Sequence, residues 1–179
     1  VEKGTLLDLS PCGIHHSWEE DLETIPLGNV LYEIQLNLMD DVSTIRSFDK
    51  GKIGKDGSLR SLQIDDYFAL ADRSVSTNDP KTHMRKAVEI KKTDMYIHDR
   101  LLESKYYSMD KVMLWSVGSE FSCVYDSFRH IFVQSGAIII TAGEGEITVT
   151  AGHSVFIPAA TERLSVRSLE SNTELLLSY

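Results

Sequence analysis

Two adjacent histidines near the start of the sequence could perform metal chemistry. His15 and His16 follow the turn Pro11-Cys12-Gly13, and neutral imidazole is the commonest metal ligand in proteins. Adjacent residues of a strand point to opposite faces, so at most one of the two histidines can face a barrel interior. The pair is therefore predicted to supply one metal ligand, and a partly buried or surface histidine is the alternative interpretation.

Three more polar side chains have types and spacing that suit a sugar or an anion. Glu33 and Gln35 lie two positions apart in an alternating run, so their side chains share one face. One interpretation is that this face lines a pocket large enough for a sugar. The alternative is that it is an exposed face of a sheet. Arg46 lies between apolar residues, and its guanidinium suits a carboxylate, a phosphate or a developing oxyanion. The alternative for Arg46 is a surface arginine whose stem packs on the protein.

A basic loop follows at residues 50–60, with the sequence KGKIGKDGSLR. Its three glycines and four basic side chains are typical of a solvated loop. The same charges could attract a phosphorylated ligand, and Lys50 is the candidate substrate-binding residue among them.

The first part of the chain supplies the elements that would position these groups. Strands are predicted at residues 5–9, 29–36 and 44–48, where apolar and polar residues alternate. A short helix is predicted within 62–70, because Asp65 and Asp66 in its first turn suit the helix dipole. The polar segment 73–86 has no apolar periodicity and is predicted to be a linker between 1–72 and 87–179.

The second part of the chain is predicted to be all-β, a sandwich or barrel of short strands separated by glycine turns. Segment 3–12 also resembles segment 151–159, since in each a glycine turn leads into a strand that ends at proline. This repeat suggests two similar β-barrels, the first of them truncated. The predicted strands span 88–97, 106–117, 121–125, 130–135, 137–142, 146–149, 153–157, 164–168 and 174–178.

Composition restricts the partners and the location that we expect. The net charge of −9 and the pI of about 5.1 disfavour binding to nucleic acid and to anionic membrane surfaces. No apolar run approaches the roughly 20 residues of a membrane span. Cys12 and Cys123 lie far apart and form no metal or redox motif, as expected of reduced thiols in a cytoplasmic protein. Because the first residue is Val1, we expect a fragment of a longer chain.

Five segments, taken in order, resemble the type I mannose-6-phosphate isomerases. The corresponding family patterns are P-A-G-T-x-H, E-I-Q, T-T-Y-R-x-Y-D, R-x-L-H-I and the hairpin G-x-G…G-D-x-x-x-x-P-A. The segments here are PCGIHH at 11–16, YEIQ at 32–35, STIRSFD at 43–49, LRSLQI at 59–64, and GEG at 143–145 with GHSVFIPA at 152–159.

The resemblance implies an all-β protein with a cupin jelly-roll barrel, or double-stranded β-helix. A partial cupin with a short helical connection would precede it. Residues 1–72 would be the C-terminal part of a first, metal-type cupin with its connecting segment, and 87–179 the C-terminal cupin. His130 and His153 lack the H-x-H plus Glu spacing of a metal-binding cupin, so the second barrel is predicted to bind no metal.

The implied activity is the zinc-assisted interconversion of mannose 6-phosphate and fructose 6-phosphate. On this reading His16 is a zinc ligand and Arg46 is the catalytic arginine that stabilises the enediolate. A catalytic zinc needs about three protein ligands, and the family's other ligands lie upstream of the matched region. We therefore expect an incomplete zinc site, and activity only with a missing N-terminal half.

The alternative function is a non-catalytic cupin relative that binds a sugar or a sugar phosphate. A purely structural β-module is a third, less specific interpretation. An open first barrel would expose strand edges, which are sites of association. Pairing with the missing half, or a homodimer, is therefore expected.

Overall fold

The computed structural model describes residues 2–10, 23, 30–36, 45–49, 51, 53–122, 126–161 and 163–179. It divides into two compact units, which are described separately. The first unit combines Val1–Asp8 with Met84–Tyr179, and the second is Leu9–His83. In the described residues, no helix is long and apolar enough to cross a membrane.

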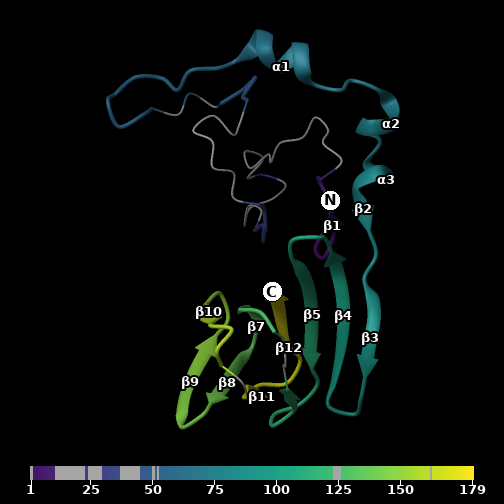
Figure 1. The fold of residues 1–179 in the computed structure, drawn as a ribbon, viewed down its shortest axis with the longest axis vertical. Helices are drawn as coiled ribbons and strands as arrows, with labels where there is room; N and C mark the ends of the chain where they lie inside the picture. Colours follow the sequence, from purple (N-terminus) through teal and green to yellow (C-terminus); the bar gives the residue numbers. More distant parts are fainter. Residues whose placement is uncertain are drawn as a thin grey trace. The chain divides into compact units, whose positions relative to one another are not determined.

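Two antiparallel sheets form most of the first unit (Figure 1). The larger sheet has the order β10-β7-β12-β5-β4-β3 and the smaller one has the order β6-β11-β8-β9. A separate two-stranded pair joins β1 to β2. The strands are β1 (Leu6–Leu7), β2 (Met84–Arg85), β3 (Val88–Lys92), β4 (Tyr96–Glu103), β5 (Ser108–Leu114), β6 (Glu120–Ser122), β7 (Arg129–Ser135), β8 (Ala137–Ala142), β9 (Gly145–Thr150), β10 (Ser154–Ile157), β11 (Ser165–Ser168) and β12 (Thr173–Ser178).

Period-two alternation builds the core of this unit. In β5, Asp110, Val112 and Leu114 are buried, while the residues between them are only half-buried. The buried side chains of both sheets form one cluster, so the two sheets enclose a common interior. That cluster contains Val112, Leu114, Phe121, Ile131, Val133, Ile138, Ile140, Val149, Ile157, Leu164, Val166, Leu175 and Leu177. The all-β prediction for this half of the chain is confirmed.

The turn between β7 and β8 requires glycine. Gly136 has φ of +82°, and a Cβ at this position would lie 2.3 Å from Oγ1 of Thr173. A side chain would therefore meet both an unfavourable backbone conformation and a clash with β12. The glycine allows β12 to pass closely beside this turn.

Among its described residues, the second unit has three short helices: α1 (Ile64–Leu70), α2 (Val75–Asn78) and α3 (Pro80–His83). The helix predicted within 62–70 is confirmed as α1, with both aspartates in its first turn. The predicted linker 73–86 instead contains α2, α3 and β2. Ser74 caps α2, because its hydroxyl accepts a hydrogen bond from the Thr77 amide at 3.3 Å. Such local bonds stabilise single helical turns without apolar periodicity.

Two strand predictions in the second unit are wrong for the described residues. Residues 30–36 and 45–49 have no strand conformation. Burial still alternates along 32–35, with Tyr32 and Ile34 half-buried and Glu33 and Gln35 exposed. Alternation of apolar and polar residues therefore predicted which of these side chains are more buried, but not the backbone conformation.

Candidate functional site

The structure places three of the five predicted site residues. Glu33 and Gln35 are exposed and lie outside any strand, and Arg46 is half-buried. His16 and Lys50 lie outside the described residues. The assignment of all five to a site therefore stays a prediction.

Arg46 is joined to a second predicted motif through the main chain. Its backbone amide donates a hydrogen bond to Oε1 of Gln63 at 3.2 Å, and its carbonyl accepts one from the Gln63 amide at 2.9 Å. This two-way bond holds segment 45–49 beside segment 59–63. We call residues 45–49 and 53–63 together the Arg46 region.

An ion pair and a small hairpin complete the Arg46 region. Arg60 Nε lies 3.0 Å from Oδ2 of Asp49, and the two side chains are 34% and 16% exposed. Ile53 forms a β-bridge with Leu59, and the Gly54 amide donates to the Ser58 carbonyl at 2.8 Å. The loop that carries basic residues is thereby folded back, so that its end lies against Asp49.

A metal ion needs several ligands that converge, and the described residues do not supply them. Among them, no three His, Cys, Asp or Glu side chains come together as a potential metal site. The predicted ligand His16 lies outside the described residues, so zinc binding stays a prediction.

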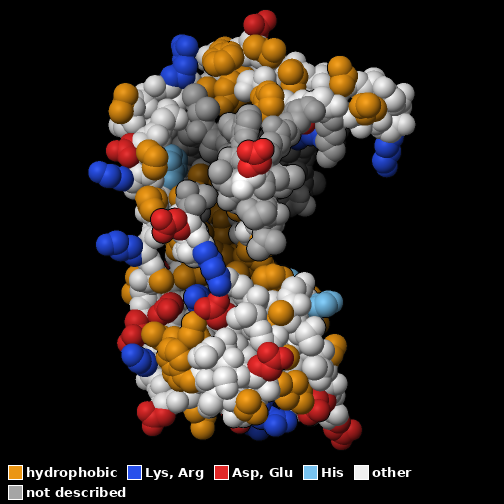
Figure 2. All heavy atoms as spheres, turned by 180° about the vertical axis from the view of Figure 1, so that it is seen from behind, with side chains coloured by type: hydrophobic (Ala, Val, Ile, Leu, Met, Phe, Trp, Pro, Cys, Tyr) orange, Lys and Arg blue, Asp and Glu red, His pale blue; other side chains and the backbone are white. Residues whose placement is uncertain are grey.

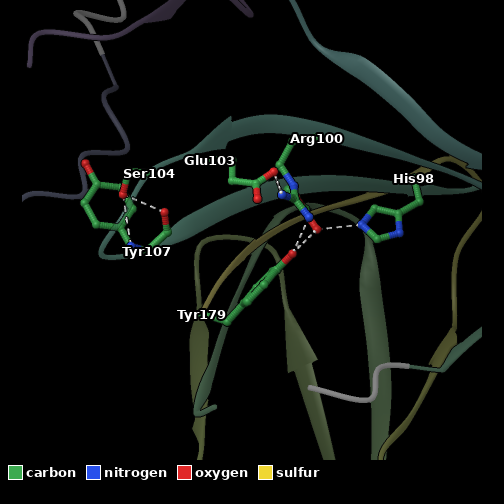
Figure 3. Close-up of polar contacts among 7 residues, drawn as sticks. His98, Arg100, Glu103, Ser104, Tyr107 and Tyr179 are labelled. Carbon is green, nitrogen blue, oxygen red and sulfur yellow. Dashed lines mark hydrogen bonds and ion pairs between the residues drawn. The ribbon is translucent and has the colours of Figure 1, made fainter. Parts of the chain in front are cut away.

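A second polar group of side chains lies in the first unit, centred on the fully buried Asp110 of β5 (Figure 3). His98 and Arg100 reach it from β4, and Tyr179 reaches it from the end of β12. His98 Nε2 lies 2.8 Å from Oδ2, the Tyr179 hydroxyl donates to Oδ2 at 2.9 Å, and Arg100 Nε donates to Oδ1. We call these four residues the Asp110 cluster.

Arg100 extends the Asp110 cluster towards the surface. One of its terminal nitrogens donates to Oε2 of Glu103 at 2.6 Å, and the other donates to the Tyr179 hydroxyl at 2.7 Å. Figure 3 shows the side chains of His98, Arg100 and Tyr179 converging from different directions. The guanidinium therefore connects three strands of the larger sheet at one point.

The electrostatics of the cluster keep Asp110 ionised. Burial alone raises the pKa of its carboxyl, but hydrogen bonds from His98 and Tyr179 and the charge of Arg100 outweigh burial. The net result is a pKa below the usual 3.8. Burial by itself lowers the pKa of Arg100. The negative charge of Asp110 and its hydrogen bond to Arg100 help to outweigh burial, so the pKa of Arg100 lies above its ordinary value. An ionised Asp110 accepts a hydrogen bond from His98 Nε2, so that nitrogen carries a hydrogen.

The Asp110 cluster is primarily a stabilising network, since its donors already converge on one carboxylate. Sequence reasoning missed it because the predicted strand ended at Ile97, before Arg100. The inward positions of β4 include the polar residues His98 and Arg100, so the usual pattern of apolar inward residues was absent. The available signal was the His-x-Arg spacing of His98 and Arg100, together with an aspartate at the inward position that precedes Val112 and Leu114.

Comparison with known proteins shows the fold. No protein-family model matches the chain, and no curated protein matches it in sequence. The mannose 6-phosphate isomerase of Bacillus subtilis is similar in structure, with a TM-score of 0.55 and 16% identity. That match covers 75% of this chain and 40% of the isomerase, so the chain spans less than half of that protein's length.

Smaller cupins match less of the chain. An RmlC-like cupin from Shewanella frigidimarina has a TM-score of 0.43 and 15% identity, covering 52% of this chain and 80% of its own. KdgF from Halomonas sp. has a TM-score of 0.44 and 11% identity, and the match covers 52% of this chain and 85% of KdgF. The strand order and the isomerase match together define a cupin jelly-roll fold. At this level of identity the likeness concerns the fold and leaves the activity open.

Proposed function

We propose that this chain is part of an aldose–ketose isomerase that interconverts mannose 6-phosphate and fructose 6-phosphate. The observation that carries the proposal is the contact between two predicted motifs. Segments 43–49 and 59–64 resemble family motifs in sequence, and the reciprocal bonds between Arg46 and Gln63 hold them together. The shared fold with a mannose 6-phosphate isomerase supports the same assignment.

In this proposal Arg46 stabilises the charge that develops on the substrate. Isomerisation moves a proton between adjacent carbons, C2 and C1, and leaves an enediolate in between. A guanidinium held beside the enediolate oxygen lowers the barrier, because it is already oriented before negative charge develops on that oxygen. Its main-chain bonds to Gln63 would keep Arg46 in place during the step.

Substrate binding is assigned to the remaining predicted residues. Glu33 and Gln35 are exposed polar side chains that could bind sugar hydroxyls. The net charge of −9 repels a phosphate, so a locally basic segment is needed, and Lys50 begins the basic loop 50–60. His16 would contribute one zinc ligand, with the other ligands supplied from outside this chain.

The test uses the full-length protein that contains this chain, with added zinc, in a coupled assay of fructose 6-phosphate formation. Turnover is expected, and Arg46→Gln should lower kcat by roughly 100- to 1,000-fold, as loss of one oxyanion-stabilising group does. Arg73→Gln, an exposed arginine outside the Arg46 region, is the matched control and should leave kcat unchanged. Absence of turnover by the wild-type protein would contradict the proposal.

The same preparation distinguishes the alternative of a non-catalytic sugar-binding cupin. Calorimetric titration with mannose 6-phosphate would then show binding without conversion. If Arg46→Gln weakened that binding while the wild type stayed inactive, the Arg46 region would be a binding site and the isomerase assignment would be wrong.

A further inference from the structure

The edge strand β3 has an exposed surface that the proposed function does not use. Within the described part of the chain, β3 is the terminal strand of the larger sheet and pairs with β4 alone. All five of its residues are exposed, including the apolar Val88 at 64% and Ile90 at 48%. An edge strand presents backbone N–H and C=O groups that another extended chain can pair with.

The edge is basic, although the chain as a whole is acidic. Segment 84–92 has four basic side chains and one acidic one, against a net charge of −9 for the whole chain. Arg85 is neutralised by Asp8, whose Oδ2 lies 3.0 Å from Nη2 of Arg85. Among the described residues, Lys86, Lys91 and Lys92 take part in no ion pair, and Lys91 Nζ lies 5.8 Å from the ring centre of Tyr96. Lys91 and Lys92 therefore place positive charge at the C-terminal end of β3, although Glu89 and Asp99 are acidic neighbours on the same hairpin.

Lysines and bulges on an edge strand discourage pairing with the wrong strand. Here a register shift between Glu89 and Lys91 marks such a bulge. A second copy of this chain that paired in a register with its lysines opposite Lys91 and Lys92 would be destabilised, because like charges directly opposite each other repel. A neutral apolar strand would leave the lysines without compensation. An acidic strand alone gains a favourable cross-strand interaction at each lysine.

We propose that β3 binds an extended acidic segment of a partner protein, which adds to the larger sheet as an outer strand. Its backbone would pair with β3, and its side chains would lie on both faces of the sheet. Lys91 and Lys92 point to opposite faces, so acidic side chains on one face of the added strand would lie beside one of these lysines, and apolar side chains on its other face would cover exposed apolar surface of β3. This inference is independent of the isomerase proposal, because β3 carries none of the residues assigned to the reaction.

The experiment measures fluorescence anisotropy with two labelled peptides, acetyl-EVEVEVE-amide and acetyl-KVKVKVK-amide. The acidic peptide should bind roughly tenfold or more tightly than the basic one, and its binding should weaken as salt is added. Lys91→Glu/Lys92→Glu should reduce that binding by about tenfold. Lys105→Glu, an exposed lysine outside β3, is the control and should have no comparable effect. Circular dichroism verifies that each variant is folded.

A third peptide separates strand addition from general charge attraction. The acidic peptide with every backbone amide N-methylated keeps its charge but has no N–H group to pair with β3 on either edge. Its binding should be lost if β3 accepts a strand. Equal binding of the methylated peptide, equal binding of the acidic and basic peptides, or dimerisation through β3 in sedimentation would each overturn the proposal. In those cases the lysines only protect the edge.

Discussion

The Asp110 cluster and the Arg46 region both pair an arginine with an aspartate, but in different environments. Asp110 is fully buried and accepts hydrogen bonds from three side chains. Asp49 pairs with an Arg60 whose side chain is one third exposed, and Arg46 is held there through main-chain bonds. An arginine–aspartate pair can therefore stabilise a barrel where it is buried. Where water competes for its hydrogen bonds, such a pair only orients a loop.

The difference also concerns how each region could be recognised. The Arg46 region is recognisable from sequence motifs, because its residues follow one another within 20 positions. The Asp110 cluster joins residues that are as many as 81 positions apart, and only the strand order brings them together. Four measurements test this comparison.

The largest expected effect is that of Asp110→Ala. This variant leaves Arg100 as a charge without its buried partner and leaves His98 and Tyr179 without their acceptor. We expect a loss of about 3–5 kcal/mol in the free energy of unfolding, the usual cost of breaking a buried pair. Urea denaturation followed by tryptophan fluorescence measures it. A loss below 1 kcal/mol would show that water reaches the carboxylate and that the two regions are alike.

Acid should weaken the wild-type protein through the same carboxyl. The pKa of Asp110 is lower in the folded state than in the unfolded chain, so the folded state binds the proton less well. Its contribution is fully present above about pH 4 and is lost as the pH falls through the folded value. Unfolding free energies between pH 7 and pH 2.5 measure this dependence. In Asp110→Asn the acid slope should be shallower by up to one proton.

A smaller effect is expected for Tyr179→Phe. This change removes one donor to Asp110 and one acceptor for Arg100, while the ring stays in place. The unfolding free energy should fall by about 1–2 kcal/mol, as for a hydrogen bond to a charged group. Tyr106→Phe, at an exposed tyrosine of the same unit, is the matched control and should change stability by less than about 0.5 kcal/mol. Equal effects of the two changes would place the Tyr179 hydroxyl outside the network.

The smallest effect is expected for Arg60→Ala in the Arg46 region. The ion pair with Asp49 is partly exposed, so it should contribute about 0.2–1 kcal/mol at low salt and less at high salt. A double-mutant cycle with Asp49→Ala measures the coupling at 20 mM and 500 mM salt. A coupling above 2 kcal/mol would place this pair in the same class as the Asp110 cluster.

Short strands with apolar inward residues were predictable from the sequence. Residues 137–142 were predicted as a strand and form β8 with the same limits. Predicted strand 88–97 is instead two strands, because Thr93 forms a tight turn and its hydroxyl accepts bonds from the amides of Met95 and Tyr96. Such a turn depends on local hydrogen bonding that alternation does not report.

The site residues were predictable only as types and spacing. The sequence suggested that Arg46 has a special role, and the structure adds its bonds to Gln63, which require knowledge of a fold. It offered no reason to connect Asp110 with Tyr179, because strand order in a sheet follows from long-range packing and not from local pattern. Exposed hydrophobic side chains such as Phe156, at 61% exposure, also depart from a simple apolar-inside rule, and orange patches remain visible on the surface in Figure 2.

The position of β12 has a consequence for how the chain folds. It follows all the other strands of the larger sheet in sequence, yet it lies in the middle of that sheet, between β5 and β7. The pairs β4–β5 and β7–β10 can form early, but they remain two separate halves until β12 arrives to join them. Closing contacts across so many residues is slow. During synthesis the growing chain therefore holds two incomplete half-sheets with open edges, and the barrel is completed when β12 has been made.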